Sequence, residues 1–524
     1  MGRTERPWAR YRLGIDVGGT NTDAVLLDRG GRPVAKAKTP TTADVTTGIV
    51  RAIDRVLLGA EELRERIGHV MLGTTHAMNA VLQRRGLRRV GVLRIGSPAT
   101  HAVRPLFGWP DDLRRAVSAG EAIVGGGHEY DGRELAPFDR EATARFVAAL
   151  PDDVEAIAIT SVFAPVSSSH ELAAAELVGK LRPELHASLS HEIGSVGLLE
   201  RENATVLNAA LAGLAQEVAE GIREALAARN LDPVTFFAQN DGTLMGIDHA
   251  TRFPVLTIGS GPANSIRGAA HLTGLTDGIV ADVGGTSTDI GVLVGGFPRE
   301  SAVGVEIGGV RTNFRMPDLV SISLGGGTVV EEVGGDVRVG PESVGYAIGG
   351  EALVFGGSTP TLTDAAVACG RVRLGEVEGV RRCEALLARA MERSDAMLAD
   401  AIDRIKVAKG ELPLVVVGGG SILVPERVPG VSEIHRPEHF EVANAIGAAI
   451  AAVGGQAERV VAMGGRTRKA VIADVAAEAR ARAIQAGADP ARVEIVEVDE
   501  IPLAYLAEPA SRVRVKAAGP LGTS

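Results

Sequence analysis

An eight-residue motif with residue types suited to phosphate and metal binding occurs twice in the chain. Residues 16–23 read DVGGTNTD and residues 282–289 read DVGGTSTD, so the two copies differ at one position. In a Gly-Gly-Thr turn the backbone N–H groups can converge on phosphate oxygens, because glycine lets the backbone approach closely. An aspartate just before the turn can hold Mg²⁺ or its waters, since Mg²⁺ binds carboxylate and phosphate oxygens together. The repeat therefore predicts a triphosphate held between two turns from opposite halves of the chain.

Each predicted role in this site belongs to a position of the motif. We expect Asp16, Asp282 and Asp289 to be catalytic, with Asp16 and Asp282 as the metal ligands. A plain hairpin turn is the alternative for either copy alone, but two unconnected turns have no reason to share aspartates and threonines. The predicted phosphate-binding residues are Gly18, Gly19, Thr20, Asn21, Gly284, Gly285, Thr286 and Ser287.

A third glycine cluster follows an apolar run in the second half of the chain. The segment LPLVVVGGGSILVP, residues 412–425, predicts a buried strand that ends at Gly418, Gly419 and Gly420. An adenine or ribose could rest on such a strand-to-helix turn, although a plain strand and loop would have the same pattern. The chain has neither the GKS/T of a Walker A loop nor a GxGxxG after an opening strand, so those types of nucleotide site are not expected.

These motifs need strands to position them, and the surrounding pattern alternates strands with helices. Apolar runs flank both copies of the repeat, and helical spacing recurs between the strand-like runs. That alternation predicts an α/β fold in which each half of the chain forms one lobe around a strand–turn–strand unit. The predicted domains are a first lobe at 1–200, a second lobe at 201–456 whose last helix can pack on the first, and a small α+β domain at 457–524.

Composition and charge exclude several kinds of protein. The chain has 524 residues, 45% of them hydrophobic, and a formal charge of −10 from 55 basic and 65 acidic residues. A protein that wraps nucleic acid usually carries a basic face, so nucleic acid is not an expected partner. The two cysteines form no zinc pattern, and no apolar stretch suits a signal peptide or a membrane span. We therefore expect a cytoplasmic protein without a membrane segment.

Several longer segments resemble the hydantoinase A/5-oxoprolinase family, which is part of the actin-like ATPase superfamily. The resemblance covers nearly the whole chain and is carried by GIDVGGTNTDAVLLD, GTTHAMNAVLQRRG, LLERENATVLNAAL, QNDGTLMGIDHATRFPVLTIGSGPANSIRGAA, ADVGGTSTDIGVL, GGVRTNFRMPDLVSISLGGGT, VRVGPESVG and PTLTDAAVACGR. It implies two ribonuclease H-like lobes around a nucleotide cleft, with two phosphate hairpins and an adenosine motif. It also implies that ATP and Mg²⁺ are bound, with Mn²⁺ or K⁺ as alternative ions.

The resemblance implies an activity as well as a fold. Members of the family couple ATP hydrolysis to the opening of cyclic amides such as hydantoins and 5-oxoproline, and some relatives carboxylate ketones. Phosphorylation of the amide oxygen would create an imidate-like ester that water can attack, while the protein positions the groups and stabilises charge. The implied partner is a B-type hydantoinase subunit, and the implied assembly is an oligomer. We therefore expect an ATP-dependent hydrolase subunit that opens a cyclic amide.

Two other kinds of function remain open from the sequence. A small-molecule kinase or a ketone carboxylase subunit of the same superfamily would use the same nucleotide site. A non-enzymatic ATP-driven switch is the second alternative, although the chain after residue 455 is too short for a long peptide-binding domain. The sequence also departs from longer relatives, because no histidine stands directly before Gly325 and no cysteine follows shortly after Gly345. That departure concerns the handling of substrate and not the binding of ATP.

Seven further residues are candidates for contacting the substrate, and each has a structural alternative. A histidine at a helix start is often a cap, a serine at a strand end can be a turn residue, and an arginine can form a salt bridge between lobes. Arginine could instead hold a carboxylate substrate through two hydrogen bonds. The candidates are Thr75, His76, Asn79, Glu202, Ser260, Arg311 and Arg315.

Overall fold

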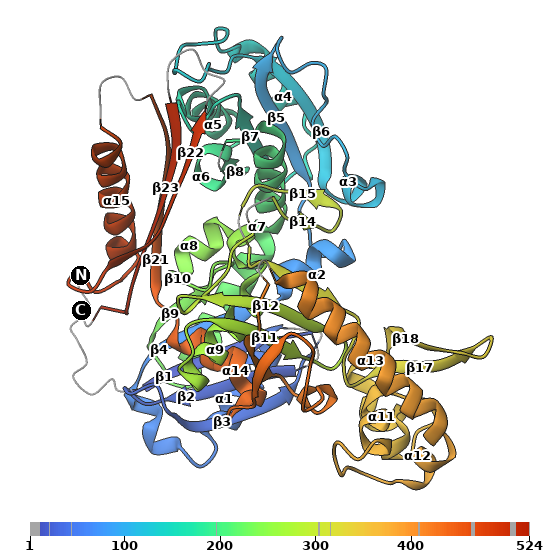
Figure 1. The fold of residues 1–524 in the computed structure, drawn as a ribbon. Coiled ribbons are helices and arrows are strands. Elements are labelled where there is room, and N and C mark those ends of the chain that lie inside the picture. The colour runs from blue at the N-terminus through green and yellow to red at the C-terminus, as the bar shows by residue number, and fades with distance from the viewer. Residues whose placement is uncertain are drawn as a thin grey trace.

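Both copies of the repeated motif form antiparallel hairpins, and each hairpin lies within a larger sheet (Figure 1). The computed structural model describes residues 11–19, 21–42, 45–194, 196–301, 304–314, 316–406, 409–462, 467–503 and 510–522. The first hairpin joins β1 (Tyr11–Val17) to β2 (Asn21–Leu27). The second joins β11 (Gly278–Val283) to β12 (Thr288–Val294). The predicted strand–turn–strand units are confirmed.

The first hairpin belongs to a nine-stranded sheet with the order β22-β23-β21-β10-β9-β4-β1-β2-β3. Leu13, Ile15 and Val17 of β1 are buried in a core with side chains of α1 (Val45–Leu57) and α7 (Leu198–Ala227). Residues two apart on a strand share a face, so this alternation directs one face of β1 toward these helices. The other strands are β3 (Pro33–Pro40), β4 (Ile67–Thr74), β9 (Val234–Ala238), β10 (Leu244–Gly246), β21 (Val453–Ala462), β22 (Glu494–Leu503) and β23 (Ala510–Gly519).

A four-stranded parallel sheet lies between β4 and α7 in the chain. Its order is β6-β5-β7-β8, from β5 (Val90–Ser97), β6 (Ser118–Gly125), β7 (Ala156–Ser161) and β8 (His186–Leu189). α4 (Arg140–Ala149) and α5 (Ser169–Leu181) share one core with this sheet, whereas α3 (Asp111–Val117) and α7 share another. α7 therefore serves two sheets, because its first half packs here and its second half packs on the nine-stranded sheet.

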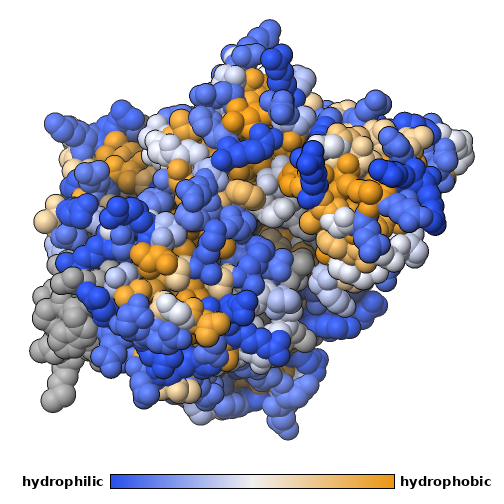
Figure 2. Space-filling model, turned by 90° about the horizontal axis from the view of Figure 1, so that it is seen from below, coloured by the Kyte–Doolittle hydropathy of each residue, from blue (hydrophilic) through white to orange (hydrophobic). Residues whose placement is uncertain are grey.

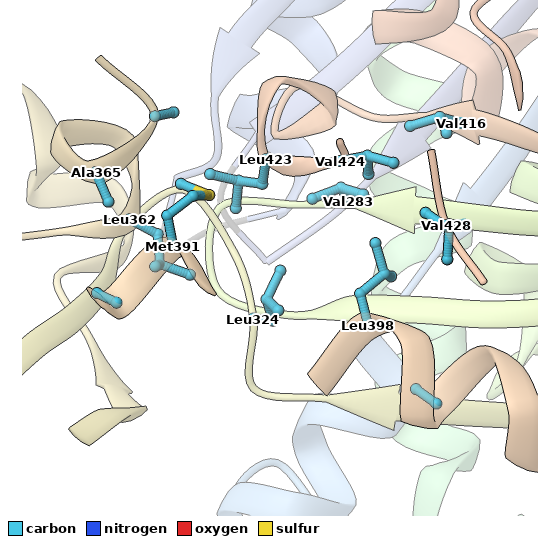
Figure 3. Close-up of a cluster of buried hydrophobic side chains, with 14 of the residues drawn as sticks. Val283, Leu324, Leu362, Ala365, Met391, Leu398, Val416, Leu423, Val424 and Val428 are labelled. Carbon is cyan, nitrogen blue, oxygen red and sulfur yellow. The ribbon is translucent and has the colours of Figure 1, made fainter. Parts of the chain in front are cut away.

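The second hairpin lies in a six-stranded sheet with the main order β13-β12-β11-β19-β20, and β16 (Leu319–Ile322) pairs with β12. Figure 3 shows Val283, Leu324 and Leu423 in one cluster with Leu362 of α11 (Leu362–Ala368) and Met391 of α13 (Glu384–Ile405). This core joins the end of β11, which carries Val283, to the two segments that carry Leu324 and Leu423. The other strands of the lobe are β13 (Phe297–Pro298), β19 (Leu412–Val417) and β20 (Val431–His435), and β17 (Thr328–Val333) and β18 (Asp336–Ser343) form a separate hairpin.

Two helices lie between the sheets and cross through glycines. α9 (Ser260–Thr273) shares a core with β11 and β19, whereas α14 (Ala443–Ile450) packs on β1 and β2. A Cβ on Gly268 would collide with Ala443 O, and a Cβ on Gly447 would collide with Asn264 O. Glycine at these positions lets the two helix backbones approach closely. The crossing connects the first lobe directly to the second.

The strand pairing departs from the predicted domain boundaries. β9 and β10 follow residue 200, yet they belong to the first sheet because β9 pairs with β4. β21 crosses the predicted boundary at 456, touches β10 at its start and pairs with β23 along its length. The terminal strands therefore extend the first sheet, with α15 (Arg468–Gln485) packed against them, and form no sheet of their own. Alternating apolar residues reveal a strand but not the sheet edge that it joins.

The surface seen from below is mostly hydrophilic, and hydrophobic side chains gather on the part that projects to the right (Figure 2). That part carries β17, β18, α11 and α12 (Glu378–Arg382) in Figure 1. Its exposed hydrophobic residues include Phe355, Leu374 and Val377. Among the helices in the described ranges, none has the length and apolar character needed to cross a membrane.

Candidate active site

The turns of the two hairpins have the same backbone hydrogen bond. Gly18 N–H donates to Asn21 O at 3.0 Å, and Gly284 N–H donates to Ser287 O at 2.9 Å. A Cβ on Gly19 would meet no heavy atom within 4 Å, so the first turn borders open space. The predicted phosphate residue Thr20 lies outside the described residues. The shared motif therefore folds into the same local structure in both lobes.

Four carboxylates flank these turns. Asp16 lies opposite Asp23 across the first hairpin, and Asp282 lies opposite Asp289 across the second. Asp16 and Asp23 are buried, at 3% and 7% exposure, whereas the second pair is partly exposed. Each hairpin thus brings the first and last residues of its motif side by side.

Two consecutive residues of α9 connect the aspartates of the two hairpins. Asn264 Nδ2 donates to Asp16 Oδ1 at 3.3 Å, and Ser265 Oγ donates to Asp282 Oδ2 at 2.5 Å. Asn444 of α14 also donates, from Nδ2, to Asp282 Oδ2 at 3.3 Å. Because Asn264 and Ser265 are neighbours in one helix, Asp16 and Asp282 lie around a single site. The two copies of the motif therefore meet at the crossing of the two central helices.

Negative charge accumulates at this site. Burial, with the charges of Asp23 and Asp282, raises the pKa of Asp16 to about 7. Burial and the charge of Asp282 also raise the pKa of Asp289 to about 6. Burial raises the pKa of Asp23 as well, although Lys38 Nζ donates to its Oδ2 at 2.9 Å and opposes that shift. Repulsion between buried carboxylates of this kind favours a bound cation.

A divalent cation fits the chemistry of the donor set. Asp16 and Asp282 supply carboxylate oxygens, and Asn264 Oδ1 is a buried acceptor without a hydrogen-bond partner among the described residues. Mg²⁺ commonly binds one or two carboxylates together with waters and phosphate oxygens. The described part of the chain has no group of three or more His, Cys, Asp or Glu side chains that could hold a metal by itself. The site therefore fits an ion that a bound phosphate helps to coordinate.

The predicted glycine cluster at 418–420 lies against the second hairpin. A Cβ on Gly418 would collide with Asp282 Oδ1, and Gly420 N–H donates to Val283 O at 2.7 Å. Gly419 borders open space, because a Cβ added there would meet no heavy atom within 4 Å. The end of β19 thus lies beside the turn of the second hairpin.

A second triple glycine, Gly325–Gly327, packs on the same turn, a contact that the sequence did not predict. Gly326 N–H donates to Gly284 O at 3.1 Å, and Gly327 N–H donates to Gly285 O at 2.7 Å. A Cβ on Gly325 would lie 2.5 Å from Thr286 N. Only glycine permits this backbone contact. The triple glycine itself was the available signal, but its partner is distant in the chain.

Residues around the end of β4 hold the first hairpin. Thr75 N–H and Thr75 Oγ1 both donate to Val17 O at 3.1 Å, and Asn79 Nδ2 donates to Thr75 Oγ1 at 3.4 Å. Ser260 Oγ donates to Thr74 O at 3.1 Å. Ser260 is buried in the first turn of α9, so the prediction that it ends a strand is wrong, because the apolar run before it forms a short helical turn.

The remaining predicted substrate contacts have different surroundings. Both oxygens of Glu202 accept hydrogen bonds from Arg94, each at 2.6 Å, and Glu202 is 1% exposed. The Glu202 carboxylate is therefore buried and already paired with Arg94, so this position does not suit contact with a substrate. Arg311 in β15 (Val310–Arg311) has an exposed side chain 4.0 Å from the Glu200 carboxylate. Arg315 lies outside the described residues.

The structure adds four residues to the site that sequence reasoning did not name for it. Asp23 ends the first copy of the motif as Asp289 ends the second, so the repeat itself could have identified it. Asn264, Ser265 and Asn444 lie in helices dominated by small and apolar residues. Polar residues in such helices are a signal for a polar site, but their partners cannot be read from the local sequence.

Two α/β lobes, each with one copy of the hairpin and joined by two crossing helices, form the predicted two-lobed α/β fold. Residues 12–181 match the hydantoinase/oxoprolinase N-terminal region, and residues 201–380 match the hydantoinase/oxoprolinase domain. The chain belongs to the hydantoinase/oxoprolinase family. The predicted family and fold class are therefore confirmed.

The relatives of this chain include a carboxylase subunit and a caprolactamase subunit. The chain is 30% identical over 397 residues to the acetophenone carboxylase gamma subunit of Aromatoleum aromaticum, an alignment that covers 69% of this chain and 53% of that protein. It is 29% identical over 409 residues to the caprolactamase subunit alpha of Pseudomonas jessenii, covering 71% of this chain and 56% of that protein. The chain thus matches about half the length of these relatives.

Two solved structures share the fold over almost the whole chain. The ATP-dependent caprolactamase from Pseudomonas jessenii superposes with a TM-score of 0.73 at 20% identity, covering 97% of this chain and 87% of that one. The nucleotide-free structure of acetone carboxylase superposes with a TM-score of 0.72 at 16% identity, covering 98% and 88%. At these identities the likeness concerns the fold.

Proposed function

We propose that this chain is the ATP-dependent subunit of an enzyme that opens a cyclic amide, such as a hydantoin or a 5-oxoproline-like lactam, by phosphorylating the amide oxygen. The observation that carries the proposal is the meeting of the two repeated hairpins, whose Asp16 and Asp282 are bonded to consecutive residues of α9. Such a site needs a ligand that has several phosphate oxygens and a bound cation. Membership of the hydantoinase/oxoprolinase family supports the choice of reaction.

Each part of the site would have a separate task. The turn amides at Gly18–Gly19 and Gly284–Gly285 would bind phosphate oxygens, and the loop at Gly418–Gly420 would contact the nucleoside. Asp16 and Asp282 would hold Mg²⁺, which neutralises charge on the phosphates when it is bound. Asn264 and Ser265 would keep the two carboxylates in place. Phosphoryl transfer depends chiefly on this kind of positioning and charge stabilisation.

The proposed reaction begins with attack of the amide oxygen on the γ-phosphorus of ATP. The bond from the γ-phosphorus to the oxygen of the leaving ADP breaks, which gives an O-phosphorylated imidate. Water then adds to the ring carbon, the ring C–N bond breaks, and the nitrogen takes up a proton. A second water hydrolyses the remaining acyl phosphate, so each turnover gives ADP, phosphate and one ring-opened amino acid.

The test is a coupled measurement of phosphate release and ring opening. Hydantoin, 5-oxoproline and ε-caprolactam would be incubated with Mg·ATP, with and without a B-type partner subunit. Phosphate and ring-opened product should appear in equal amounts, and a non-hydrolysable ATP analogue should give neither. A stable phosphorylated product would instead show a small-molecule kinase. ATP hydrolysis that no carbonyl compound stimulates would leave only a non-enzymatic switch.

A ketone carboxylase subunit is the second candidate function. The observation in its favour is the 30% identity to the acetophenone carboxylase gamma subunit. Phosphorylation of an enolate oxygen would use the same site as phosphorylation of an amide oxygen, so the step assigned to this chain is the same. Acetophenone with bicarbonate distinguishes the two, since a carboxylated product would replace the ring-opened acid.

A partner chain and an oligomeric assembly are part of the proposal. The relatives include proteins named as subunits of larger enzymes, namely caprolactamase alpha, acetophenone carboxylase gamma and acetone carboxylase beta. The chain also matches only about half the length of the first two. Size measurement of the purified chain alone and with a B-type subunit would test both points.

A further inference from the structure

Asp23 of the first hairpin has a cationic partner on the next strand of the sheet. Asp16 of β1 pairs with Asp23 of β2, and Asp23 pairs in turn with Lys38 of β3. Residues that pair directly across neighbouring strands share one face of the sheet, so these three side chains form a row. Lys38 Nζ lies 2.9 Å from each carboxylate oxygen of Asp23. A positive charge is therefore in contact with the carboxylate that neighbours Asp16.

The second hairpin has the same row of aspartates without the cation. Asp282 of β11 pairs with Asp289 of β12, and Asp289 pairs with Ser321 of β16, whose Oγ donates to Asp289 Oδ1. The third strand thus supplies an uncharged hydrogen-bond donor in this lobe and a lysine in the other. Because the aspartates of the two rows correspond, the lysine is an addition that belongs to the first lobe.

Lys38 is held in place by a second acceptor, which belongs to a distant segment. Its Nζ also donates to Glu441 O at 3.0 Å, in the turn η6 (Phe440–Val442) that directly precedes α14. The neighbouring carbonyl, Phe440 O, accepts a hydrogen bond from Gly418 N–H at 3.0 Å. Lys38 therefore connects the first hairpin to the segment that contacts the glycine cluster at 418–420.

This pairing determines which carboxylates are free to bind a cation. Asp23 is the direct cross-strand neighbour of Asp16, so by position it could be a further metal ligand. Its oxygens already have the Lys38 ammonium as a charged donor, and a metal ion would have to displace that group to bind them. Mg²⁺ commonly takes only one or two carboxylates, and Asp16 and Asp282 supply two without Asp23.

We propose that Lys38 is a positioning residue of the cation site, which pairs with Asp23 in place of the metal ion and leaves the ion to Asp16 and Asp282. Asp23 is then the anchor of the lysine and not a metal ligand. The pair is neutral as a unit, so it limits the negative charge of the site while it joins the first hairpin to η6. The use of the site for Mg·ATP rests on the proposed function, whereas the role of the pair in binding a cation does not.

A double-mutant cycle on metal binding tests this role. Binding of Mn²⁺ to the full chain, with ADP present, would be followed by electron paramagnetic resonance, which needs neither an acceptor nor turnover. Asp23→Asn leaves the Lys38 charge uncompensated beside the site and should weaken Mn²⁺ binding about 10-fold. Adding Lys38→Met removes that charge as well and should return the affinity to within about 2-fold of wild type. A double variant that binds as weakly as Asp23→Asn would show that Asp23 is a ligand and would overturn the proposal.

Lys36→Met is the matched control for Lys38→Met. Lys36 lies two residues earlier on the same face of β3, and its Nζ contacts the side chains of Glu441 and His439. Added to Asp23→Asn, it removes the same charge and should leave Mn²⁺ binding as weak as in Asp23→Asn alone. Equal restoration by both lysine substitutions would overturn the specific role of Lys38. Thermal melting checks the fold, and Asp23→Ala and Lys38→Gln replace any variant that does not fold.

The measurement separates this proposal from the proposed function. A restored double variant, in a protein that opens no ring with Mg·ATP, would contradict the function and leave the role of Lys38 standing. A double variant that stays weak, in a protein that does open a ring, would have the reverse consequence. Wild-type protein that binds no Mn²⁺ with ADP present would overturn both.

Discussion

At the scale of single residues, the carboxylates around the two turns carry the proposed chemistry. Asp282 accepts hydrogen bonds from Ser265 and Asn444, and it raises the pKa of both Asp16 and Asp289. The Asp282 carboxylate therefore lies close to carboxylates of both hairpins. A metal ion bound to Asp282 could for this reason be shared by the two hairpins.

The isosteric change Asp282→Asn should lower turnover of Mg·ATP by about 100-fold or more, because it removes a metal-binding charge and keeps the shape of the side chain. Phosphate release measures turnover, and thermal melting checks that the fold remains. Asp403→Asn, on an exposed position of α13, is the control and should turn over as wild type does. Turnover that persists in Asp282→Asn would contradict the metal-binding role.

Asp16 gives a prediction on pH. Its folded-state pKa of about 7 lies above the ordinary value of 3.8, so in the absence of a metal ion the folded protein binds this proton more tightly than the unfolded chain. The resulting stabilisation is full below about pH 4 and is lost as the pH rises to about 7. Asp16→Asn should therefore raise stability near neutral pH, by an amount on the order of 1–3 kcal/mol, and abolish turnover.

Thermal melting in EDTA at several pH values between about 4 and 8 would test this. The difference between Asp16→Asn and wild type should grow as the pH rises through that range. Subtracting the wild-type curve removes the contributions of the other titrating groups. A difference that stays constant with pH would show that Asp16 has an ordinary pKa.

At the scale of structural elements, three separate segments shape the turn of the second hairpin. β11 and β12 form the turn itself, the loop at Gly325–Gly327 donates to its carbonyls, and the end of β19 packs on its other side. These segments share one hydrophobic core, in which Val283, Leu324 and Leu423 lie together (Figure 3). The turn is therefore held by packing as well as by its own sequence.

Gly325→Ala should distort this turn. The added Cβ would lie 2.5 Å from Thr286 N, and both partners are backbone atoms that cannot rotate away. We expect affinity for Mg·ATP to fall about 10-fold or more, because the phosphate-binding amides would move. Gly349→Ala, in α10 (Ile348–Glu351), is the matched control, since a Cβ there meets no heavy atom within 4 Å. Equal affinity in the two variants would mean that the turn does not bind the nucleotide.

At the scale of the whole molecule, the last strand ties the lobes together. Lys516 of β23 lies 2.8 Å from Asp241 Oδ2, in the turn between β9 and β10, and 3.0 Å from Glu300 Oε1, after β13 of the second lobe. Burial by itself would lower the pKa of Lys516, but the charges of Asp241 and Glu300 raise that pKa above its ordinary value. Arg514 of the same strand also contacts Glu300, at 3.2 Å. The C-terminal strand is therefore part of the interface between the lobes.

Lys516→Met should destabilise the protein by about 3–5 kcal/mol, because removing one partner of a buried ion pair leaves the other charge uncompensated. Thermal or chemical unfolding would measure the change. Lys469→Met, on the exposed start of α15, should change stability by less than about 0.5 kcal/mol. A similar stability for both variants would show that β23 does not anchor the second lobe.

Residues that act within one short segment could be assigned from the sequence. The repeated motif predicts both hairpins, because glycine turns and alternating burial are encoded locally. The turn at Asp241 is local in the same way, because Thr243 N–H donates to Asp241 Oδ1, two residues earlier, at 2.9 Å. The family could be assigned as well, because its segments extend through most of the chain.

Contacts between distant segments depended on the tertiary structure. Asn264 and Ser265 become site residues only because α9 crosses between the lobes. The predicted substrate contact Glu202, in α7, is instead buried and paired with Arg94 of β5. The terminal strands likewise joined the first sheet instead of forming their own domain. A local pattern specifies which face of an element is buried, whereas the partner on that face is chosen by packing of the whole chain.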